Sequence, residues 1–416
     1  VFHTDCEPYA EINGKKLTKN GEVDGVKIEF VTNEEAAKRM ADGKPRFIKD
    51  HTIYKVPALS PVKGEIPFSK VSGEARPLDA AGCYRGYGEY TAKVPAGKKV
   101  FLEDASDVIT AYIDGNYAGT KVNGGTCMEY PESKTGEYKF VAEKWGNTNF
   151  DDSRLPSMML ACRKGIAGIY AIESDYKLRQ MRFTVPKEFG VYDGDRHADP
   201  QTMISNDKWN TTRIPTLCAY SFETARTHDK LYLAVGGENE VCVFVNGKSL
   251  GGVPYGYIDL TAACPKGKTV TVTIQYRKRN WAESVGALRL LQLSKVQTSM
   301  RIAKDVAFGA LTYPEKGEKV TLKAGSVALS GFKVKNRKDS YVTLTLKDCK
   351  ATVMAGGRVL ARMIGEWEGA PQMAGSERDM FYLPVEYMGD GTVTLLLECV
   401  GDKPSIEKIE ITERNY

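Results

Sequence analysis

The stretch that decides the fold is residues 108–119, VITAYIDGNYAG, which is matched by residues 241–251, VCVFVNGKSLG. Each copy is a run of β-branched and aromatic residues that reaches a tight turn, Asp114-Gly115 in the first and Asn246-Gly247 in the second. Asp-Gly and Asn-Gly favour two-residue hairpin turns because these residues adopt positive φ at low cost. The copies are 132 residues apart. The sequence therefore predicts two β-hairpins in two related domains.

A fainter third copy follows near the C-terminus. Residues 341–346, YVTLTL, and residues 351–360, ATVMAGGRVL, repeat the pattern of strands around a glycine turn. From about residue 58 onward, short alternating strands recur between Gly, Asn and Asp turns, which is typical of sandwiches and jelly rolls. Repetition of one supersecondary unit along the chain favours three β-sandwiches in series.

Residues 1–57 hold the one convincing helix pattern. Thr32 and Glu35 have the spacing of a capping box, good helix formers fill 34–41, and Gly43 is placed to end the helix. A strand over 26–30 precedes it. We therefore predict an all-β protein of tandem jelly-roll or β-sandwich domains behind a short N-terminal strand–helix segment. The predicted parts are residues 1–57, 58–186, 187–298 and 299–416.

Composition excludes several classes of function. The chain has 416 residues, and 58 Lys and Arg against 53 Asp and Glu give a net charge of +5. That charge is too dilute to indicate a nucleic-acid footprint. No stretch approaches the roughly 18 apolar residues that would span a bilayer. We expect neither nucleic acid nor membrane insertion.

The nine cysteines form no disulfide framework in the sequence, because several, such as Cys242 and Cys399, lie inside strand patterns. Buried free thiols that pack as small hydrophobes explain them better. The compartment stays open, with an extracellular or periplasmic location slightly favoured. Residue 1 is Val and no signal-peptide pattern follows it, so we expect a processed or excised piece of a longer protein.

Residues 143–150, EKWGNTNF, and 162–169, CRKGIAGI, form a strand that ends in a Gly-x-x-Asn-aromatic turn, followed by a Lys-Gly-aliphatic strand. This pattern resembles the galactose-binding-like jelly roll of family 35 β-galactosidases. Residues 86–90, GYGEY, look like the Gly-Tyr-x-x-Tyr strand that opens the same domain, and 112–115, YIDG, look like its hairpin. The residues that fit the turn and the strand after it are Gly146, Asn149, Phe150, Lys164 and Gly165.

The resemblance covers about residues 58–186, and the second copy resembles the same fold more loosely. Asn147 stands where the family often has Arg, the insertion 151–156 is longer than usual, and the catalytic barrel is missing. The resemblance implies a noncatalytic C-terminal region of a β-galactosidase-like glycoside hydrolase. Its implied partner is a galactoside or the catalytic domain of the same enzyme. An alternative is a structural or adhesive protein that binds no sugar.

Sugar binding would use aromatic faces against the pyranose ring, with amides, carboxylates and Arg on its hydroxyls. Asp151 and Asp152 are adjacent, so on a strand they point to opposite faces and cannot form a facing glycosidase pair by themselves. As an alternative to sugar binding, both hold a turn with Arg154, and Tyr257 packs as a strand residue. The candidates are Trp145, Asn147, Asn149, Asp151, Asp152, Arg154, Tyr257, Arg277 and Trp281, with Trp209, Tyr255 and Asn280 as further polar or aromatic residues.

Other chemistry finds little support in the sequence. Residues 247–251 fit the Gly-x-Ser-x-Gly pattern, but Pro254 follows where that motif requires a helix. The four histidines are scattered, without metal or triad spacing. An intact hydrolase would need a cleft between sandwiches with two facing carboxylates of perturbed pKa. We expect no cofactor except, as an option, a structural calcium ion, whose weak candidate ligands are Asp104, Asp107, Asp193 and Asp195.

Overall fold

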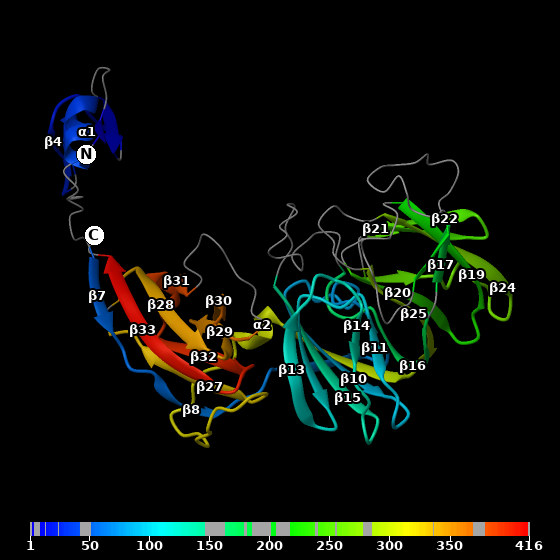
Figure 1. Cartoon of the computed structure of the whole chain (residues 1–416). Helices are drawn as coiled ribbons and strands as arrows, with labels where there is room; N and C mark the ends of the chain where they lie inside the picture. Colours follow the sequence, from blue (N-terminus) through cyan, green and yellow to red (C-terminus); the bar gives the residue numbers. More distant parts are fainter. Residues whose placement is uncertain are drawn as a thin grey trace. The chain divides into compact units, whose positions relative to one another are not determined.

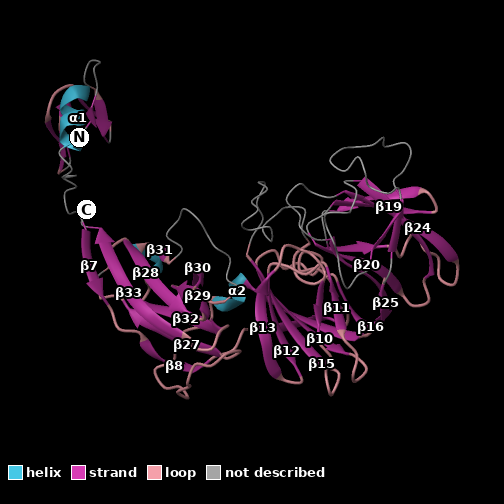
Figure 2. Cartoon of the chain, in the orientation of Figure 1, coloured by secondary structure: helices cyan, strands magenta, loops and turns pink. Residues whose placement is uncertain are grey.

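The computed structural model describes residues 2–3, 9–12, 14–23, 25–41, 51–145, 163–178, 181–184, 201–204, 217–237, 240–253, 256–277, 285–335, 337–368 and 379–414. Strands make up nearly all of the regular structure in these ranges (Figure 2). The predicted all-β fold, with β-sandwiches and a short N-terminal strand–helix segment, is confirmed. The chain forms two compact units, residues 1–53 with 412–416, and residues 54–411.

The smaller unit contains helix α1 (Asn33–Ala41). Its first turn is capped as the sequence predicts, because the Glu35 N–H donates to Thr32 Oγ1 at 3.1 Å. Glu34 and Glu35 also place negative charge at the positive end of the helix. Three short ladders accompany the helix: β1 (Phe2–His3) with β6 (Phe30–Val31), β2 (Ala10–Ile12) with β3 (Lys15–Leu17), and β4 (Gly21–Val23) with β5 (Val26–Ile28).

The larger unit contains five sheets, of which the first two enclose the first sandwich. Sheet 1 has the order β13 (Asn116–Val122), β12 (Val108–Ile113), β15 (Glu137–Lys144), β10 (Gly86–Lys93), β26 (Gln297–Lys304), β9 (Ser69–Ser72). Sheet 2 has the order β14 (Met128–Tyr130), β11 (Val100–Glu103), β16 (Gly168–Lys177), β25 (Val285–Lys295), β20 (Lys230–Gly237), β23 (Gly256–Asp259). The core of the first sandwich, between sheet 1 and strands β14, β11 and β16, includes Tyr90, Ile109 and Phe140.

The second sandwich uses the other half of sheet 2. Its core, which includes Leu231, Val243 and Leu288, lies between strands β25, β20 and β23 and a third sheet. Because β16 pairs with β25, the first and second sandwiches share one continuous sheet. Sheet 3 has the order β18 (Gln201–Ile204), β17 (Met181–Thr184), β19 (Leu217–Ala225), β24 (Thr269–Arg277), β21 (Glu240–Val245), β22 (Lys248–Val253).

The third sandwich consists of sheets 4 and 5 around a core that includes Phe332, Val353 and Leu395. Helix α2 (Asp305–Phe308) precedes its later strands, and the 3₁₀ helix η4 (Val385–Tyr387) lies between two of them. Sheet 4 has the order β30 (Arg358–Ile364), β29 (Cys349–Ala355), β32 (Thr392–Cys399), β27 (Val327–Lys333), β8 (Leu59–Lys63). Sheet 5 has the order β31 (Met380–Leu383), β28 (Ser340–Lys347), β33 (Ser405–Arg414), β7 (His51–Lys55).

Two strands belong to other sandwiches than the domain boundaries predicted from the sequence indicate. That division assigns β8 to the first sandwich and β26 to the third, but β8 pairs with β27 and β26 pairs with β10. Figure 1 shows blue β8 beside the much later strand β27. The physical reason is that strand neighbours are chosen by tertiary packing, and consecutive strands are adjacent in only about two-thirds of cases. The third sandwich is therefore formed by a strand that precedes the other two sandwiches in the sequence and by strands that follow them.

The three hairpins predicted from the repeated stretches are all present. They join β12 to β13, β21 to β22, and β29 to β30. Each turn has two residues in the left-handed region, and each ladder shifts register between the third and second residues before the turn, as expected when a bulge adjusts strand twist. The φ angles are 52° and 76° at Asp114 and Gly115, 48° and 78° at Asn246 and Gly247, and 52° and 76° at Gly356 and Gly357.

Candidate functional site: a cleft between the first and third sandwiches

The candidate site forms where the outer face of sheet 1 meets the outer face of sheet 4. Side chains alternate along a strand, so the neighbours of core residues Tyr90 and Leu397 point out of their own sandwiches. The two outward faces pack against each other in a separate apolar cluster. Its buried members are Val62, Tyr87, Val141, Ala303, Phe308, Leu329, Met354 and Leu396.

A network of buried charges lies within this contact. The Tyr87 hydroxyl is 2.8 Å from Glu143 Oε1 and 2.7 Å from Glu398 Oε1. Lys350 Nζ donates to Glu143 Oε2 at 2.5 Å and to Glu398 Oε2 at 3.1 Å. The Arg362 guanidinium is 4.9 Å from the centre of the Tyr87 ring and 3.6 Å from Glu143. First-sandwich and third-sandwich residues are therefore joined by paired charges as well as by apolar contact.

The two glutamates share one tyrosine proton. A tyrosine hydroxyl carries one proton, so it cannot donate to Glu143 and Glu398 together. The hydroxyl also lies 3.0 Å from Thr352 Oγ1, and either of these two oxygens can be the donor. Burial, opposed by Lys350 and reinforced by Glu143, raises the pKa of Glu398. Burial alone would raise the pKa of Glu143, but Lys350 and Arg362 outweigh it and lower that pKa.

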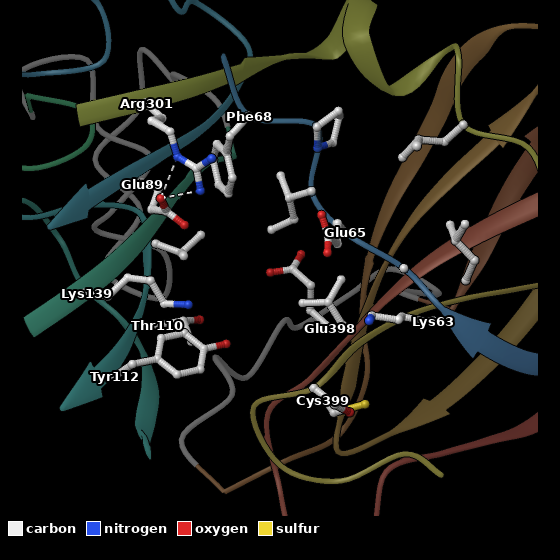
Figure 3. A pocket seen from close by; sticks show the side chains of 18 of the residues that line it. Lys63, Glu65, Phe68, Glu89, Thr110, Tyr112, Lys139, Arg301, Glu398 and Cys399 are labelled. Carbon is white, nitrogen blue, oxygen red and sulfur yellow. Dashed lines mark hydrogen bonds and ion pairs between the residues drawn. The ribbon is translucent and has the colours of Figure 1, made fainter. Parts of the chain in front are cut away.

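Beside the buried network the two faces separate and leave a cleft of about 900 Å³. Figure 3 shows Glu89, Lys139 and Arg301 on one wall and Lys63, Glu65 and Glu398 on the other. The volume lies within the range of small-molecule sites, roughly 300–1,000 Å³. Further lining residues include Ile66, Phe68, Thr110, Tyr112, Val141, Leu311, Glu318, Leu329 and Cys399.

Several polar groups of the cleft are held in place by neighbours. Glu89 Oε1 accepts from Arg301 Nε at 2.8 Å and is 2.6 Å from its Nη2. The Arg301 guanidinium lies 5.4 Å from the Phe68 ring centre. Lys139 Nζ lies 4.1 Å above the Tyr112 ring, whose hydroxyl donates to a backbone carbonyl at 2.9 Å. A site with fixed donors and acceptors loses less conformational entropy when a ligand binds.

Two of the sequence-derived sugar-binding candidates have described side chains, Trp145 and Tyr257, and neither lines this cleft. Trp145 is half-buried and packs with Trp367 in a small apolar cluster. The Tyr257 hydroxyl donates to Glu129 at 2.6 Å, and its ring packs edge-on against Phe101. Of Arg277 the structure describes the backbone, which pairs at the end of β24. Asn147, Asn149, Asp151, Asp152, Arg154, Tyr255, Trp209, Asn280 and Trp281 lie outside the described residues, and so do Gly146 and Phe150.

The aspartates considered for calcium have other partners where they are described. Asp107 pairs with Lys164 at 2.7 Å and accepts from the Trp145 N–H at 2.8 Å. Asp104 Oδ2 lies 3.3 Å from Arg163. Asp193 and Asp195 lie outside the described residues. Within the described ranges no group of three or more His, Cys, Asp or Glu side chains could hold a metal ion.

The Lys-Gly part of the resemblance has a structural explanation. The Lys164 ammonium is fully buried against Asp107. Gly165 has a φ of +84°, and a Cβ there would lie 2.4 Å from the Tyr90 hydroxyl. Both residues are therefore required by the packing of the first sandwich, and the pattern by itself points to no ligand.

No protein-family model and no curated protein matches the chain. Among solved structures the chain is similar to a glycosyl hydrolase family 2 member from Bacteroides cellulosilyticus, with 9% identity and a TM-score of 0.23, over 54% of this chain and 31% of that one. It is similar to a rhamnosidase from Novosphingobium sp. PP1Y, with 13% identity and a TM-score of 0.22, over 66% and 27%. It is also similar to a β-glucuronidase from Ruminococcus gnavus, with 13% identity and a TM-score of 0.21, over 56% and 44%.

The chain spans less than half of the length of each of these three proteins. All three are glycoside hydrolases by name, and none of the three is named a family 35 β-galactosidase. No helix in the described ranges is long and apolar enough to cross a membrane.

The sequence patterns miss the cleft residues for a simple reason. Glu89, Lys139 and Arg301 alternate with core residues, and a polar residue at such a position normally indicates a solvated sheet face. Glu89, with Tyr87, does fall inside the GYGEY stretch that the resemblance singled out. What turns these positions into a cleft wall is the packing of the third sandwich against sheet 1.

Proposed function

We propose that this chain is a noncatalytic region of a glycoside hydrolase-like protein, that it supports a catalytic domain, and that it binds carbohydrate in the cleft between the first and third sandwiches. The observation that carries the proposal is the composition of the cleft walls. They offer three basic side chains, Lys63, Lys139 and Arg301, and three acidic ones, Glu65, Glu89 and Glu318, beside the aromatic rings of Phe68 and Tyr112.

This composition suits a neutral saccharide. Sugar hydroxyls both donate and accept hydrogen bonds, so a wall with carboxylate acceptors and ammonium or guanidinium donors satisfies them in both roles. Because basic and acidic side chains share the walls, the cleft suits a neutral ligand better than an ion of either sign. β-Galactosides are the first ligands to test, because residues 58–186 resemble the jelly roll of family 35 β-galactosidases.

The arrangement of the buried glutamates supports the noncatalytic part of the proposal. A glycosidase needs two carboxyl groups that face each other across a sugar. Glu143 and Glu398 have pKa values displaced in opposite directions. However, Lys350 bridges them, and Glu143 is not among the residues that line the cleft. A substrate would have to displace this ion pair to lie between them.

Titration calorimetry with galactose, lactose and a panel of neutral and acidic oligosaccharides tests the binding site. We expect saturable binding that Lys139→Met and Glu65→Gln weaken about tenfold or more, because each loses a charge-assisted hydrogen bond. Lys121→Met, an exposed change on neighbouring strand β13, serves as the matched control and should bind normally.

A second candidate function is that of a structural protein that binds no sugar. The observation that supports it is the set of buried contacts that join the sandwiches. It predicts no heat of binding with any saccharide, and that result would overturn the proposed cleft function. Appreciable hydrolysis of a nitrophenyl β-galactoside by the purified chain would overturn the noncatalytic assignment.

A further inference from the structure

A second cavity opens on the same outer face of sheet 4 as the cleft. Its volume is about 580 Å³, which also lies within the range of small-molecule sites, roughly 300–1,000 Å³. Thr394 on β32 and its register partner Met354 on β29 both line it. Glu398, which lines the cleft, follows Thr394 by four positions on the same strand. An even spacing places both side chains on one face of the strand, about 13 Å apart.

Leu311 is shared by the two cavities, because it is among the residues that line each of them. It packs against the apolar cluster that contains Leu396, the residue of β32 midway between Thr394 and Glu398. Leu311 itself is only half-buried, so part of its side chain stays exposed between the cavities. A ligand that is long enough to reach both cavities would pass over this leucine.

Thr394 has a hydrogen-bonding group that the protein does not use. The residue is 3% exposed, and its Oγ1 accepts from the Tyr313 N–H at 3.0 Å. A threonine hydroxyl also carries one proton to donate, and no residue of the described ranges accepts it. A buried donor without an acceptor is unfavourable. A ligand oxygen in the second cavity would supply the missing acceptor.

The other polar groups of the second cavity repeat the mixture found in the cleft. Lys333 is an exposed donor, and the Asp390 carboxylate accepts from the Thr392 N–H at 2.9 Å and from its hydroxyl at 3.1 Å. These bonds lower the pKa of Asp390 and favour its ionised form. The Tyr313 ring is held in place because its hydroxyl donates to the Ser60 carbonyl at 2.7 Å. Basic, acidic and aromatic groups therefore meet in both cavities, as the hydroxyls and the apolar face of a neutral sugar require.

We infer that the cleft and the second cavity are two subsites of one extended site for a neutral oligosaccharide longer than a disaccharide, whose chain passes over Leu311. The inference rests on the proposed saccharide binding in the cleft. When one end of such a chain occupies the cleft, its other end is held near the second cavity at a high effective concentration. A long chain therefore binds more tightly than a short one without any new contact in the cleft.

Titration calorimetry with two homologous series of oligosaccharides tests the inference. The series are β-linked galactose and β-linked glucose, each from the disaccharide to the hexasaccharide. In at least one series, we expect the wild-type chain to bind the hexasaccharide about tenfold or more tightly than the disaccharide.

Variants of the second cavity show whether it is the source of this gain. Lys333→Met and Thr394→Val should each lose most of the gain with length, because each removes a donor to the distant end of the chain. Thr394→Ser retains the hydroxyl and should keep the gain. Lys335→Met, an exposed change two positions after Lys333 at a residue that does not line the cavity, is the matched control and should also keep it.

The outcomes separate this inference from the proposed function. If the disaccharide binds and Lys139→Met weakens it, but the hexasaccharide binds no more tightly, the cleft function stands and the extended site is overturned. An equal gain with length in the wild type and in Lys333→Met would also overturn the extended site. If no saccharide of any length binds, both proposals are wrong. The wild-type series decides the question even if a variant fails to fold.

Discussion

At the scale of single residues, Tyr87 and Glu398 show how a buried carboxyl group can be accommodated without a full charge. Tyr87 is fully buried and its hydroxyl lies between two carboxyl groups. An ionised glutamate without sufficient partners would be strongly destabilising there. The raised pKa of Glu398 favours its neutral form, whereas the lowered pKa of Glu143 favours a carboxylate next to Lys350. The neutral side chain then costs little to bury.

This proton gives the protein a predictable response to pH. The pKa of Glu398 is raised above its ordinary value of 4.5. As pH rises past that value the unfolded chain releases a proton that the folded chain keeps, so stability falls until the folded pKa is reached. Each unit of raised pKa corresponds to about 1.4 kcal/mol. Glu398→Gln keeps a donor for Tyr87 but cannot ionise, so it should remove this decline.

The prediction is checked by measuring the melting temperatures of the wild type and of Glu398→Gln from about pH 5 to about pH 8. The melting temperature of the variant should rise relative to that of the wild type as pH increases. Glu137→Gln, an exposed change on β15, should leave the wild-type profile unchanged. Parallel profiles for wild type and Glu398→Gln would show that Glu398 is ionised in the folded chain. The lowered pKa of Glu143 acts in the other direction and costs stability only as pH falls below 4.5.

At the scale of secondary-structure elements, the three hairpins connect sequence and structure most directly. Each turn requires two residues with positive φ, and the chain supplies Asp-Gly, Asn-Gly or Gly-Gly at these positions. Glycine and asparagine tolerate this region, whereas a residue with an ordinary Cβ pays about 1–2 kcal/mol. Local chemistry alone therefore makes these turns readable in the sequence.

Gly247 offers the sharpest test of that reasoning. Its φ is +78° and a Cβ there would meet no atom within 4 Å, so substitution probes the backbone alone. Gly247→Ala should cost about 1–2 kcal/mol, and Gly247→Asn clearly less. The loss of stability is measured by amide hydrogen exchange in β21 and β22.

Gly73 provides the matched control, because it also has open space around it but no positive φ. Gly73→Ala should be neutral or slightly stabilising. If all three variants exchange alike, strain at the turn is not what selects glycine at position 247.

At the scale of the whole molecule, the sandwiches of residues 54–411 are joined by shared structure. The first and second sandwiches share sheet 2, and a cluster that includes Phe101 and Tyr232 is buried against that sheet. The first and third meet through the apolar cluster and the charges around Lys350. Removing one partner of a buried charge group is costly because the other charge stays buried and unpaired.

Lys350→Met should therefore uncouple the third sandwich from the first. We expect a loss of about 3–5 kcal/mol, and calorimetry should show an early unfolding transition that is absent in wild type. Lys408 makes a more exposed pair with Glu410 on β33, so Lys408→Met should cost less than about 1 kcal/mol. Equal losses in the two variants would contradict a special role for the buried lysine.

The sequence by itself determined the β class, the capped helix at Asn33–Ala41 and the three hairpins, because each depends on residues close together in the chain. It did not determine which strands share a sheet, so β8 and β26 were assigned to the wrong sandwiches. The cleft could not be read from the sequence either, since Glu89 and Glu398 are 309 positions apart.

Only the tertiary structure decided that the outward faces of sheets 1 and 4 meet. That contact turns alternating polar residues, which look solvated in the sequence, into a buried charge network and a cleft wall. The physical reason is that turns and caps are governed by local backbone energetics, whereas sheet partners and clefts depend on burying apolar faces contributed by distant parts of the chain.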